Sequence, residues 1–332
     1  MSEFEMSPLA LAAARGNEDI FTLLLAHPKI NREILDSSHD TILKHAAFGG
    51  NAHIVQEVLQ WPESDSQSTG EDGSTPLMWA ASQGHEAAFR LLFNTKGGLK
   101  DSSACRANHG LHVLQDEKRH GRGPAPGQNS RLDYALPGRT HVLPGSSALD
   151  AAARAGHESI VQMILERSEE ESRTSDLRGR TALVNAAMAG HLGVVKQFLA
   201  HNHPDINSPD NDHLTPLAHA AAAGHLPIVR ALLEHRGIDI EYALPVAVAH
   251  GQVDMARLLL DSKIAATHSE IENATQLGNI VLERSRSDQP LPVCPVKVQE
   301  ALDIMKQYQD SMAAPRPLGT ANDGCQLTFE NL

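Results

Sequence analysis

The chain has 332 residues, a formal net charge of −13, three cysteines and only 4% aromatic residues. The negative charge argues against a nucleic acid as partner, because the phosphate backbone would be repelled. No stretch reaches the roughly 20 apolar residues of a membrane helix. Three widely spaced cysteines indicate neither a disulfide framework nor a zinc site. We therefore expect an intracellular protein, cytoplasmic or nuclear, with no signal peptide, membrane span, metal or cofactor.

A helix-turn-helix pattern begins near the N-terminus and recurs. Its first helix starts after a Ser or Thr that can cap free backbone N–H groups, and it stops at a Gly that can adopt the left-handed conformation. A second helix follows, with Ile, Val and Leu at helical spacing. Three copies occupy residues 4–93, and their helix-stop glycines are Gly16, Gly50 and Gly84. The constant spacing of 34 residues (50 − 16 and 84 − 50) predicts a front array of stacked repeats.

The pattern is absent from residues 94–146, which are rich in Gly, Pro, Arg and His and show neither helical nor strand periodicity. This composition predicts a flexible insert. The glycines on either side, Gly84 and Gly156, are 72 residues apart (156 − 84), close to two periods. The alternative is therefore a repeat that has lost its signature, for example through a frameshift. In either case we expect a flexible break between the front array and the rear one.

The pattern resumes in residues 147–282. Three copies keep the 34-residue spacing, at Gly156, Gly190 and Gly224, and a shorter copy ends its first helix at Gly251. The residues around Gly278 resemble a decayed last copy in which that glycine again ends a helix. The sequence therefore predicts a rear array of three to four repeats plus the decayed one.

Residues 283–332 contain a Pro-rich hinge, a predicted helix from Val296 to Met312 and a polar tail expected to be disordered. Val298, Leu302 and Met305 lie on one side of that helix. We expect this side to cover the apolar end of the array. Docking into a groove of a partner is the alternative.

These copies resemble the ankyrin-repeat family, whose repeat of about 33 residues has a turn, two antiparallel helices and a T-P-L-H-x-A core. The resemblance implies an all-α fold, an ankyrin-repeat solenoid interrupted by the insert. The family's His after Leu, which normally helps tie neighbouring repeats together, is replaced here. The residues in that slot are Lys44, Met78, Asp150, Val184 and Ala218.

The resemblance also implies a non-catalytic scaffold that binds another protein through a concave face, and we expect it to act as a monomer. The candidate binding residues lie before the helix-stop glycines and in the turns before the capping Thr. They are Phe48, Ser82, Gln83, Arg154, Met188, Glu71, Asp72, Arg178, Arg180, Asn211 and Asp212. Phe48, Arg154 and Met188 are the expected anchors, because aromatic, Met and Arg side chains are enriched at interfaces.

Three other functions stay open. One is a substrate-recruiting or regulatory subunit of a larger assembly such as a ubiquitin ligase, although no assembly motif flanks the repeats. Another is an enzyme with its site in the insert, although no phosphate-binding loop, G-x-S-x-G motif or paired carboxylates occur. The third is a fragment or decayed member of a longer repeat protein.

Four of the 19 histidines follow the helix-stop glycine of their repeat, in the same register. They are His85, His157, His191 and His225. Recurrence in register predicts a structural hydrogen bond to the adjacent turn rather than catalysis or metal binding. His201, His203 and Asp205 form a weak metal candidate, but zinc sites need three or four converging ligands. No metal site is therefore predicted.

Overall fold

The computed structural model describes residues 6–32, 35–36, 39–70, 73–95, 146–167, 174–201, 204–262, 268–285 and 293–313. Within these ranges the regular structure is helical, apart from one isolated bridge between Ser175 and Thr181. The helices are α1 (Pro8–Ala14), α2 (Glu18–Leu25), α3 (Ile42–Gly49), α4 (Ala52–Leu59), α5 (Pro76–Gln83), α6 (Glu86–Phe93), α8 (Ala148–Ala155), α9 (Glu158–Arg167), α10 (Ala182–Ala189), α11 (Leu192–Ala200), η3 (Pro204–Asn207), α12 (Pro216–Ala223), α13 (Leu226–Leu233), α14 (Ala243–Ala249), α15 (Val253–Asp261), α16 (His268–Ser285) and α17 (Pro295–Ala313). None of the helices described combines the length and the apolar character that a membrane span requires.

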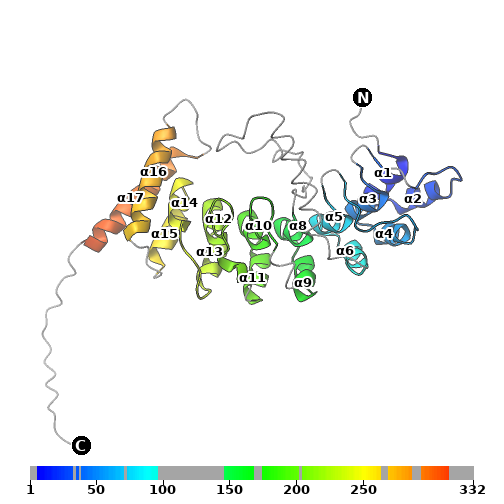
Figure 1. Cartoon of the computed structure of the whole chain (residues 1–332). Helices are drawn as coiled ribbons and strands as arrows, with labels where there is room; N and C mark the ends of the chain where they lie inside the picture. The colour runs from blue at the N-terminus through cyan, green and yellow to red at the C-terminus, as the bar shows by residue number, and fades with distance from the viewer. Residues whose placement is uncertain are drawn as a thin grey trace, which may run out of the picture.

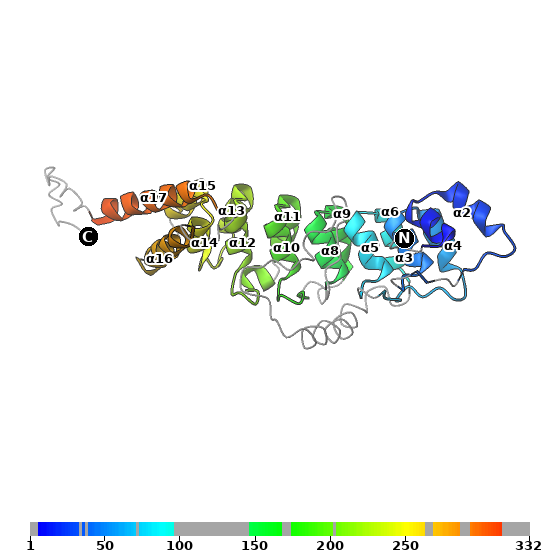
Figure 2. The same cartoon turned by 90° about the horizontal axis from the view of Figure 1, so that it is seen from above.

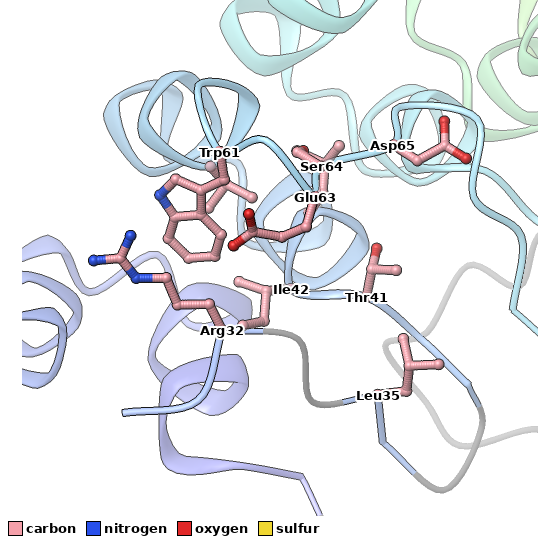
Figure 3. Close-up of a pocket in the computed structure, with 10 residues that line it drawn as sticks. Arg32, Leu35, Thr41, Ile42, Trp61, Glu63, Ser64 and Asp65 are labelled. Atoms are coloured by element: carbon pink, nitrogen blue, oxygen red, sulfur yellow. The ribbon is translucent and has the colours of Figure 1, made fainter. Parts of the chain in front are cut away.

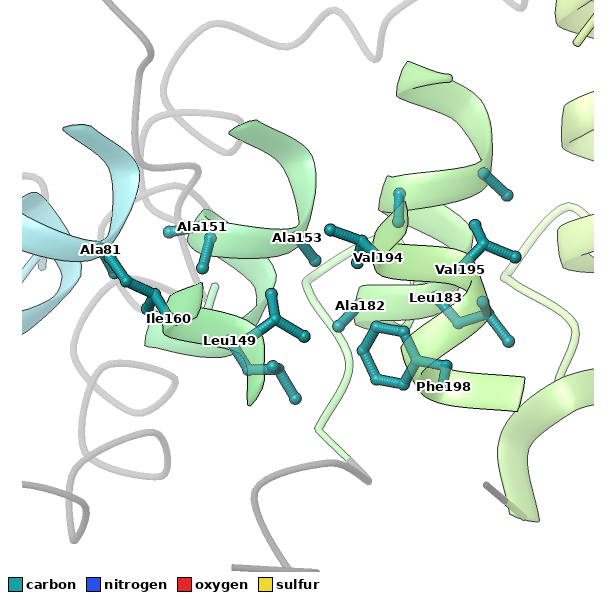
Figure 4. Packing of buried hydrophobic residues seen from close by; sticks show 14 of the residues in the cluster. Ala81, Leu149, Ala151, Ala153, Ile160, Ala182, Leu183, Val194, Val195 and Phe198 are labelled. Atoms are coloured by element: carbon teal, nitrogen blue, oxygen red, sulfur yellow. The ribbon is translucent and has the colours of Figure 1, made fainter. Parts of the chain in front are cut away.

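The helices form two rows (Figure 1). The first helices of the pairs lie side by side on the inside of a gentle curve, and the second helices lie behind them. Each first helix packs against the first helix of the next repeat, from α1 to α14. Alanines such as Ala81, Ala153 and Ala187 are fully buried in this row and let the helices approach closely, while Val194, Val195 and Phe198 fill the space behind (Figure 4). The predicted all-α ankyrin-type solenoid is confirmed.

The helix ends have the predicted chemistry. In the sixth repeat, Thr215 Oγ1 accepts a hydrogen bond from the backbone N–H of Ala218 at 3.3 Å, and Pro216 occupies the first helical position. The first helix ends at Gly224, whose φ of +78° would strain any residue with a Cβ. The sequence therefore encodes both where this helix starts and where it stops.

A recurring side-chain hydrogen bond ties each repeat to the one before it. The His that follows a helix-stop glycine lies against the helix-stop glycine of the preceding repeat, and its Nε2 donates to a backbone carbonyl there. The bonds are His85 to Phe48 (3.0 Å), His157 to Ser82 (3.1 Å), His191 to Arg154 (2.8 Å) and His225 to Met188 (3.1 Å). At the next junction the amide of Gln252 takes the same place, 3.2 Å from the carbonyl oxygen of Ala222. The predicted structural role of these histidines is confirmed.

The expected break between the front and rear arrays is wrong. Helix α5 packs directly against α8, and α6 against α9, so the stack runs without interruption (Figures 1 and 2). The bond from His157 to Ser82 spans 75 residues of sequence, whereas the equivalent bonds span 37, yet its geometry is the same. Arg167 adds a hydrogen bond from its Nη1 to the carbonyl oxygen of Phe93 at 3.1 Å.

The fourth repeat thus occupies the place beside the third, and no further repeat fits between them. This excludes a degenerate repeat within the stack at that point. Residues 96–145 lie outside the described residues, so the expectation of a flexible insert there stays a prediction.

The prediction of a decayed last repeat is also wrong. Helix α16 is one continuous helix that packs against α14 and runs through Gly278. A Cβ on Gly278 would lie 2.8 Å from a methyl of Leu302 in α17, so this glycine permits close approach of two helices. Val298 and Met305 of α17 are buried. The expectation that this helix covers the end of the array is confirmed.

Overpacking the first-helix row tests how closely it is packed. Ala221 is fully buried, whereas Ala223 on the same helix is exposed. We expect Ala221→Leu to lower the free energy of unfolding by about 1–3 kcal/mol, and Ala223→Leu to change it much less. Urea denaturation of both variants measures the difference, and equal effects would contradict the close packing of this row.

Candidate protein-binding surface

The inner surface of the curve, formed by the first helices and the turns before them, carries an aromatic pair. The rings of Phe48 in α3 and Trp79 in α5 meet edge to face, with centroids 5.2 Å apart. The Nζ of Lys44 lies 5.7 Å from the centroid of the Trp79 ring. Trp79 Nε1 donates to Ser74 Oγ at 2.6 Å. Both rings are partly exposed, so an ordered aromatic surface is available for contact.

A charged cluster occupies the inner surface at the fourth and fifth repeats. The guanidinium of Arg180 lies 2.9 Å from Asp176 Oδ2, and that of Arg154 lies 3.9 Å from the same atom. Arg154 also donates to Asn185 Oδ1 at 3.3 Å. The side chain of Arg154 is 25% exposed, and Met188 beside the cluster is partly exposed. These contacts fix the direction of Arg154 before any partner arrives.

Asp150 lies beneath this cluster and is completely buried. Its Oδ2 accepts hydrogen bonds from the backbone N–H and the Oγ of Ser147, both at 2.9 Å. Its Oδ1 has no hydrogen-bond partner among the described residues. Burial raises the pKa of Asp150 to about 7, with a further increase from the charge of Asp176; the bonds from Ser147 and the charge of Arg154 act in the opposite direction. The carboxyl therefore carries a proton over much of the acidic range.

The structure corrects two of the candidate binding residues. Ser82 is 2% exposed, and its Oγ donates to the carbonyl oxygen of Trp79 at 2.9 Å, so it faces its own helix. Arg180 is 6% exposed because its guanidinium is paired with Asp176. Neither side chain is available to anchor a partner.

The other candidates stay compatible with binding. Phe48, Gln83, Arg154 and Met188 are partly exposed on the first helices, and Arg178, Asn211 and Asp212 are exposed in the turns. Adjacent turns are also joined, since Asn211 Nδ2 donates to the carbonyl oxygen of Leu177 at 3.1 Å. Glu71 and Asp72 lie outside the described residues.

Trp79 was not among the predicted binding residues, which came only from the positions before the helix-stop glycines and from the turns before the capping Thr. In the equivalent position the neighbouring repeats carry His45, Ala151, Asn185 and His219. Trp79 is a large aromatic residue at a position where the other repeats have polar or small residues, and this contrast was the signal in the sequence.

One group of the described residues has ligand atoms close enough to hold a metal ion, namely Asp36, Asp40 and His45, within 4.8 Å of one another. His45 Nε2 donates to Asp36 Oδ2 at 3.0 Å, and Lys44 Nζ lies 2.5 Å from Asp40 Oδ1, where it competes with a cation. Burial lowers the pKa of His45 despite the nearby carboxylates.

The same Asp–His pair recurs in the sixth repeat, where His219 Nε2 lies 2.7 Å from Asp210 Oδ2. The recurrence indicates that the pair ties a turn to its first helix. Of the weaker metal candidate in the sequence, His201 Nδ1 donates to the carbonyl oxygen of Gln197, and His203 lies outside the described residues.

A cavity of about 190 Å³ lies between the turns that follow α2 and α4. In Figure 3, Arg32 and Trp61 stand together on one side of it, with the guanidinium carbon 5.3 Å from the ring centroid. The lining residues are Arg32, Leu35, Thr41, Ile42, Leu43, Val58, Trp61, Glu63, Ser64 and Asp65. Ligand pockets usually measure about 300–1,000 Å³, so this cavity does not support a small-molecule site.

Known proteins match the repeats of this chain. "Probable E3 ubiquitin-protein ligase XBOS33" of Oryza sativa subsp. japonica is 28% identical over 168 residues, which are 48% of this chain and 31% of that protein. "Ankyrin repeat domain-containing protein SAT10" of Stachybotrys chartarum is 29% identical over 175 residues, which are 49% of this chain and 7% of that protein. The chain thus spans less than a third of either relative.

The fold has a solved counterpart in the human ASB11 ankyrin repeat domain, with a TM-score of 0.53 and 18% identity over 79% of this chain and 100% of that one. A family model described as ankyrin repeats (3 copies) matches residues 9–104 and 149–243, more than half of the chain. The chain therefore belongs to the ankyrin-repeat family, whose domains are generally protein-binding modules.

Proposed function

We propose that this chain binds a partner protein inside the cell through the inner surface of its first helices. The anchors are the pair of Phe48 and Trp79, then Arg154 and Met188. The edge-to-face contact of the two aromatic rings is the observation that carries most of the proposal. It holds two interface-favoured side chains ordered while leaving part of each ring in solvent.

Side chains that are already ordered before a partner arrives favour binding, because they lose less entropy on association. A long side chain that becomes immobile on association costs about 0.5–1.5 kcal/mol of entropy. Arg154 is already held by Asn185 and Asp176, and the Trp79 ring is held by Ser74 and Phe48. Association therefore loses little conformational entropy at these residues.

The name of the rice relative agrees with one alternative, a subunit that recruits substrates for ubiquitin transfer. That match covers 31% of the relative, so the activity in its name does not carry over to this chain. Binding of a protein on the inner surface is common to a scaffold and to a recruiting subunit, and our proposal is limited to that step.

The test begins with proteins from a cell lysate that are retained by the immobilised chain and identified by mass spectrometry. Their affinity is then measured for the triple variant Phe48→Ala/Arg154→Ala/Met188→Ala. Loss of interface anchors is expected to weaken binding by about 2 kcal/mol or more, roughly 30-fold. The matched control is Gln162→Ala/Lys196→Ala/Arg230→Ala, at exposed positions of second helices. Equal losses in the two triple variants would contradict the proposal.

A further inference from the structure

Asp150 of α8 is a buried acid that the repeat itself does not require. The equivalent residues of three other repeats are apolar, namely Met78, Val184 and Ala218. Asp150 Oδ2 completes a capping box with Ser147, whereas α5, α10 and α12 begin at a capping Thr without such a carboxyl. Its Oδ1 is buried and has no hydrogen-bond partner among the described residues. The carboxyl is therefore more than a helix cap.

Few charged groups surround this carboxyl. Helices α5 and α10, which pack on the two sides of α8, contain no ionisable side chain. The ionisable side chains of α9 are exposed, and they are Glu158, Glu166 and Arg167. In the turn before α10, Arg178 is exposed and Arg180 is paired with Asp176. Among the described residues, the charges that act on Asp150 are those of Arg154 and Asp176.

Arg154 connects the buried acid to the inner surface. It lies four residues after Asp150 on α8, a spacing that makes two side chains neighbours on a helix. Its Nη2 donates to Asn185 Oδ1 at 3.3 Å and lies 3.9 Å from Asp176 Oδ2. Opposite charges attract strongly where water is excluded. An ionised Asp150, with its unpartnered Oδ1, therefore competes with Asn185 and Asp176 for the Arg154 guanidinium.

We propose that ionisation of Asp150 draws the Arg154 guanidinium inward, and that protein binding on the inner surface depends on protons for this reason. The first step concerns the chain alone, and the second step rests on the proposed function. Burial raises the pKa of Asp150 to about 7, so the change falls near neutral pH.

The direction of the effect follows from linkage. The charge of Arg154 lowers the pKa of Asp150. A partner group that engages Arg154 weakens this influence, so the pKa of Asp150 rises and the complex binds more protons than the free chain. Affinity is therefore expected to fall as the pH rises through 7. We expect a fall of about three- to tenfold between pH 6 and pH 8, and a tenfold fall corresponds to a rise of about one in the pKa.

Arginine-selective ¹⁵N labelling of the full chain tests the first step without a partner. The Nε–H signal of Arg154, assigned by its loss in Arg154→Lys, is expected to move with a midpoint near pH 7. In Asp150→Asn this movement is expected to be absent.

His191 provides the matched control, because its Nε2 donates to the carbonyl oxygen of Arg154 at 2.8 Å and a histidine can also change charge near neutral pH. His191→Gln is expected to keep the movement of the Arg154 signal. Gln suits this position, since Gln252 makes the equivalent bond at another junction. An Arg154 signal that stays fixed in the natural chain overturns the proposal. So does a signal that still moves in Asp150→Asn or no longer moves in His191→Gln.

The second step is tested with a partner protein retained from the lysate. The natural chain and Asp150→Asn are expected to bind it equally at pH 6, whereas the variant is expected to bind about three- to tenfold more tightly at pH 8. Titration of the partner itself cancels in the ratio of the two affinities. A ratio that is the same at both pH values overturns the second step. Failure of the proposed function would appear separately, as equal losses in the two triple variants, and the Arg154 signal would still decide the first step.

Discussion

Asp150→Asn is expected to stabilise the protein, and the gain is expected to grow by about 2–3 kcal/mol between pH 5 and pH 8. Asp150 is completely buried, and burial raises the pKa of its carboxyl to about 7 from the model-peptide value of 3.8. Asn keeps the shape of the side chain and can still accept from the backbone N–H of Ser147, but it carries no charge at any pH.

The sign follows from the protons that each state binds. Between about pH 4 and pH 7 the folded state holds the Asp150 proton while the unfolded state releases it, so the stability of the natural chain falls as the pH rises through this window. Above pH 7 the full cost of a buried charge is present, on the order of 4 kcal/mol. The Asn variant avoids this cost.

Chemical denaturation at several pH values measures the difference between the variant and the natural chain. Titration of the other groups cancels in that difference. Asp254→Asn, at an exposed acid in the first turn of α15, is the control, because it makes the same chemical change without removing a buried carboxyl. A gain from Asp150→Asn that is the same at pH 5 and pH 8 would show that Asp150 is ionised over the whole range.

The sequence predicts the repeats well because every copy contains the same local capping and helix-stop residues. A capping Thr, a Pro at the first helical position and a left-handed Gly act within one turn of a helix, and the structure has all three at Thr215, Pro216 and Gly224. The structural role of His157 and its equivalents was predictable for the same reason, since a residue that recurs in register meets the same neighbours in every repeat.

Long-range placement was less predictable. Residues 96–145 separate α6 from α8 along the chain, but the sequence does not show whether the ends of such a segment are adjacent. The entropy of closing a loop grows only slowly with its length. The contacts of α5 with α8 therefore outweigh the cost of a long connection, and the stack is continuous where a break was expected.

The sequence predicts which repeat positions form the candidate surface, but not which side chains at those positions are exposed. The position two residues before the helix-stop glycine holds partly exposed Phe48 and Met188 but buried Ser82. A small hydroxyl can bond to its own helix, whereas a larger side chain extends outward. Arg180 was expected in solvent, yet Asp176 in the same turn pairs with it. Pairings of this kind depend on the fold of the turn and not on repeat spacing.

Ile160→Ala is expected to lower the free energy of unfolding by about 2–5 kcal/mol, as for other large apolar side chains removed from a core. Ile160 lies in α9 at 1% exposure, whereas Ile20 at the equivalent position of the first repeat is 48% exposed. Its preceding repeat is the third, on the far side of residues 96–145. The size of the loss therefore measures whether the third and fourth repeats are packed together in solution.

Ile20→Ala is the matched control, since it makes the same change at the equivalent position of α2, which packs against no preceding repeat among the described residues. Ile20 is 48% exposed, so the loss is expected to stay within about 0.5 kcal/mol, as for most surface substitutions. Urea denaturation of both variants measures the two losses. If Ile160→Ala costs as little as Ile20→Ala, the third and fourth repeats are separate in solution. A loss several times larger is what a stack continuous from α1 to α17 requires.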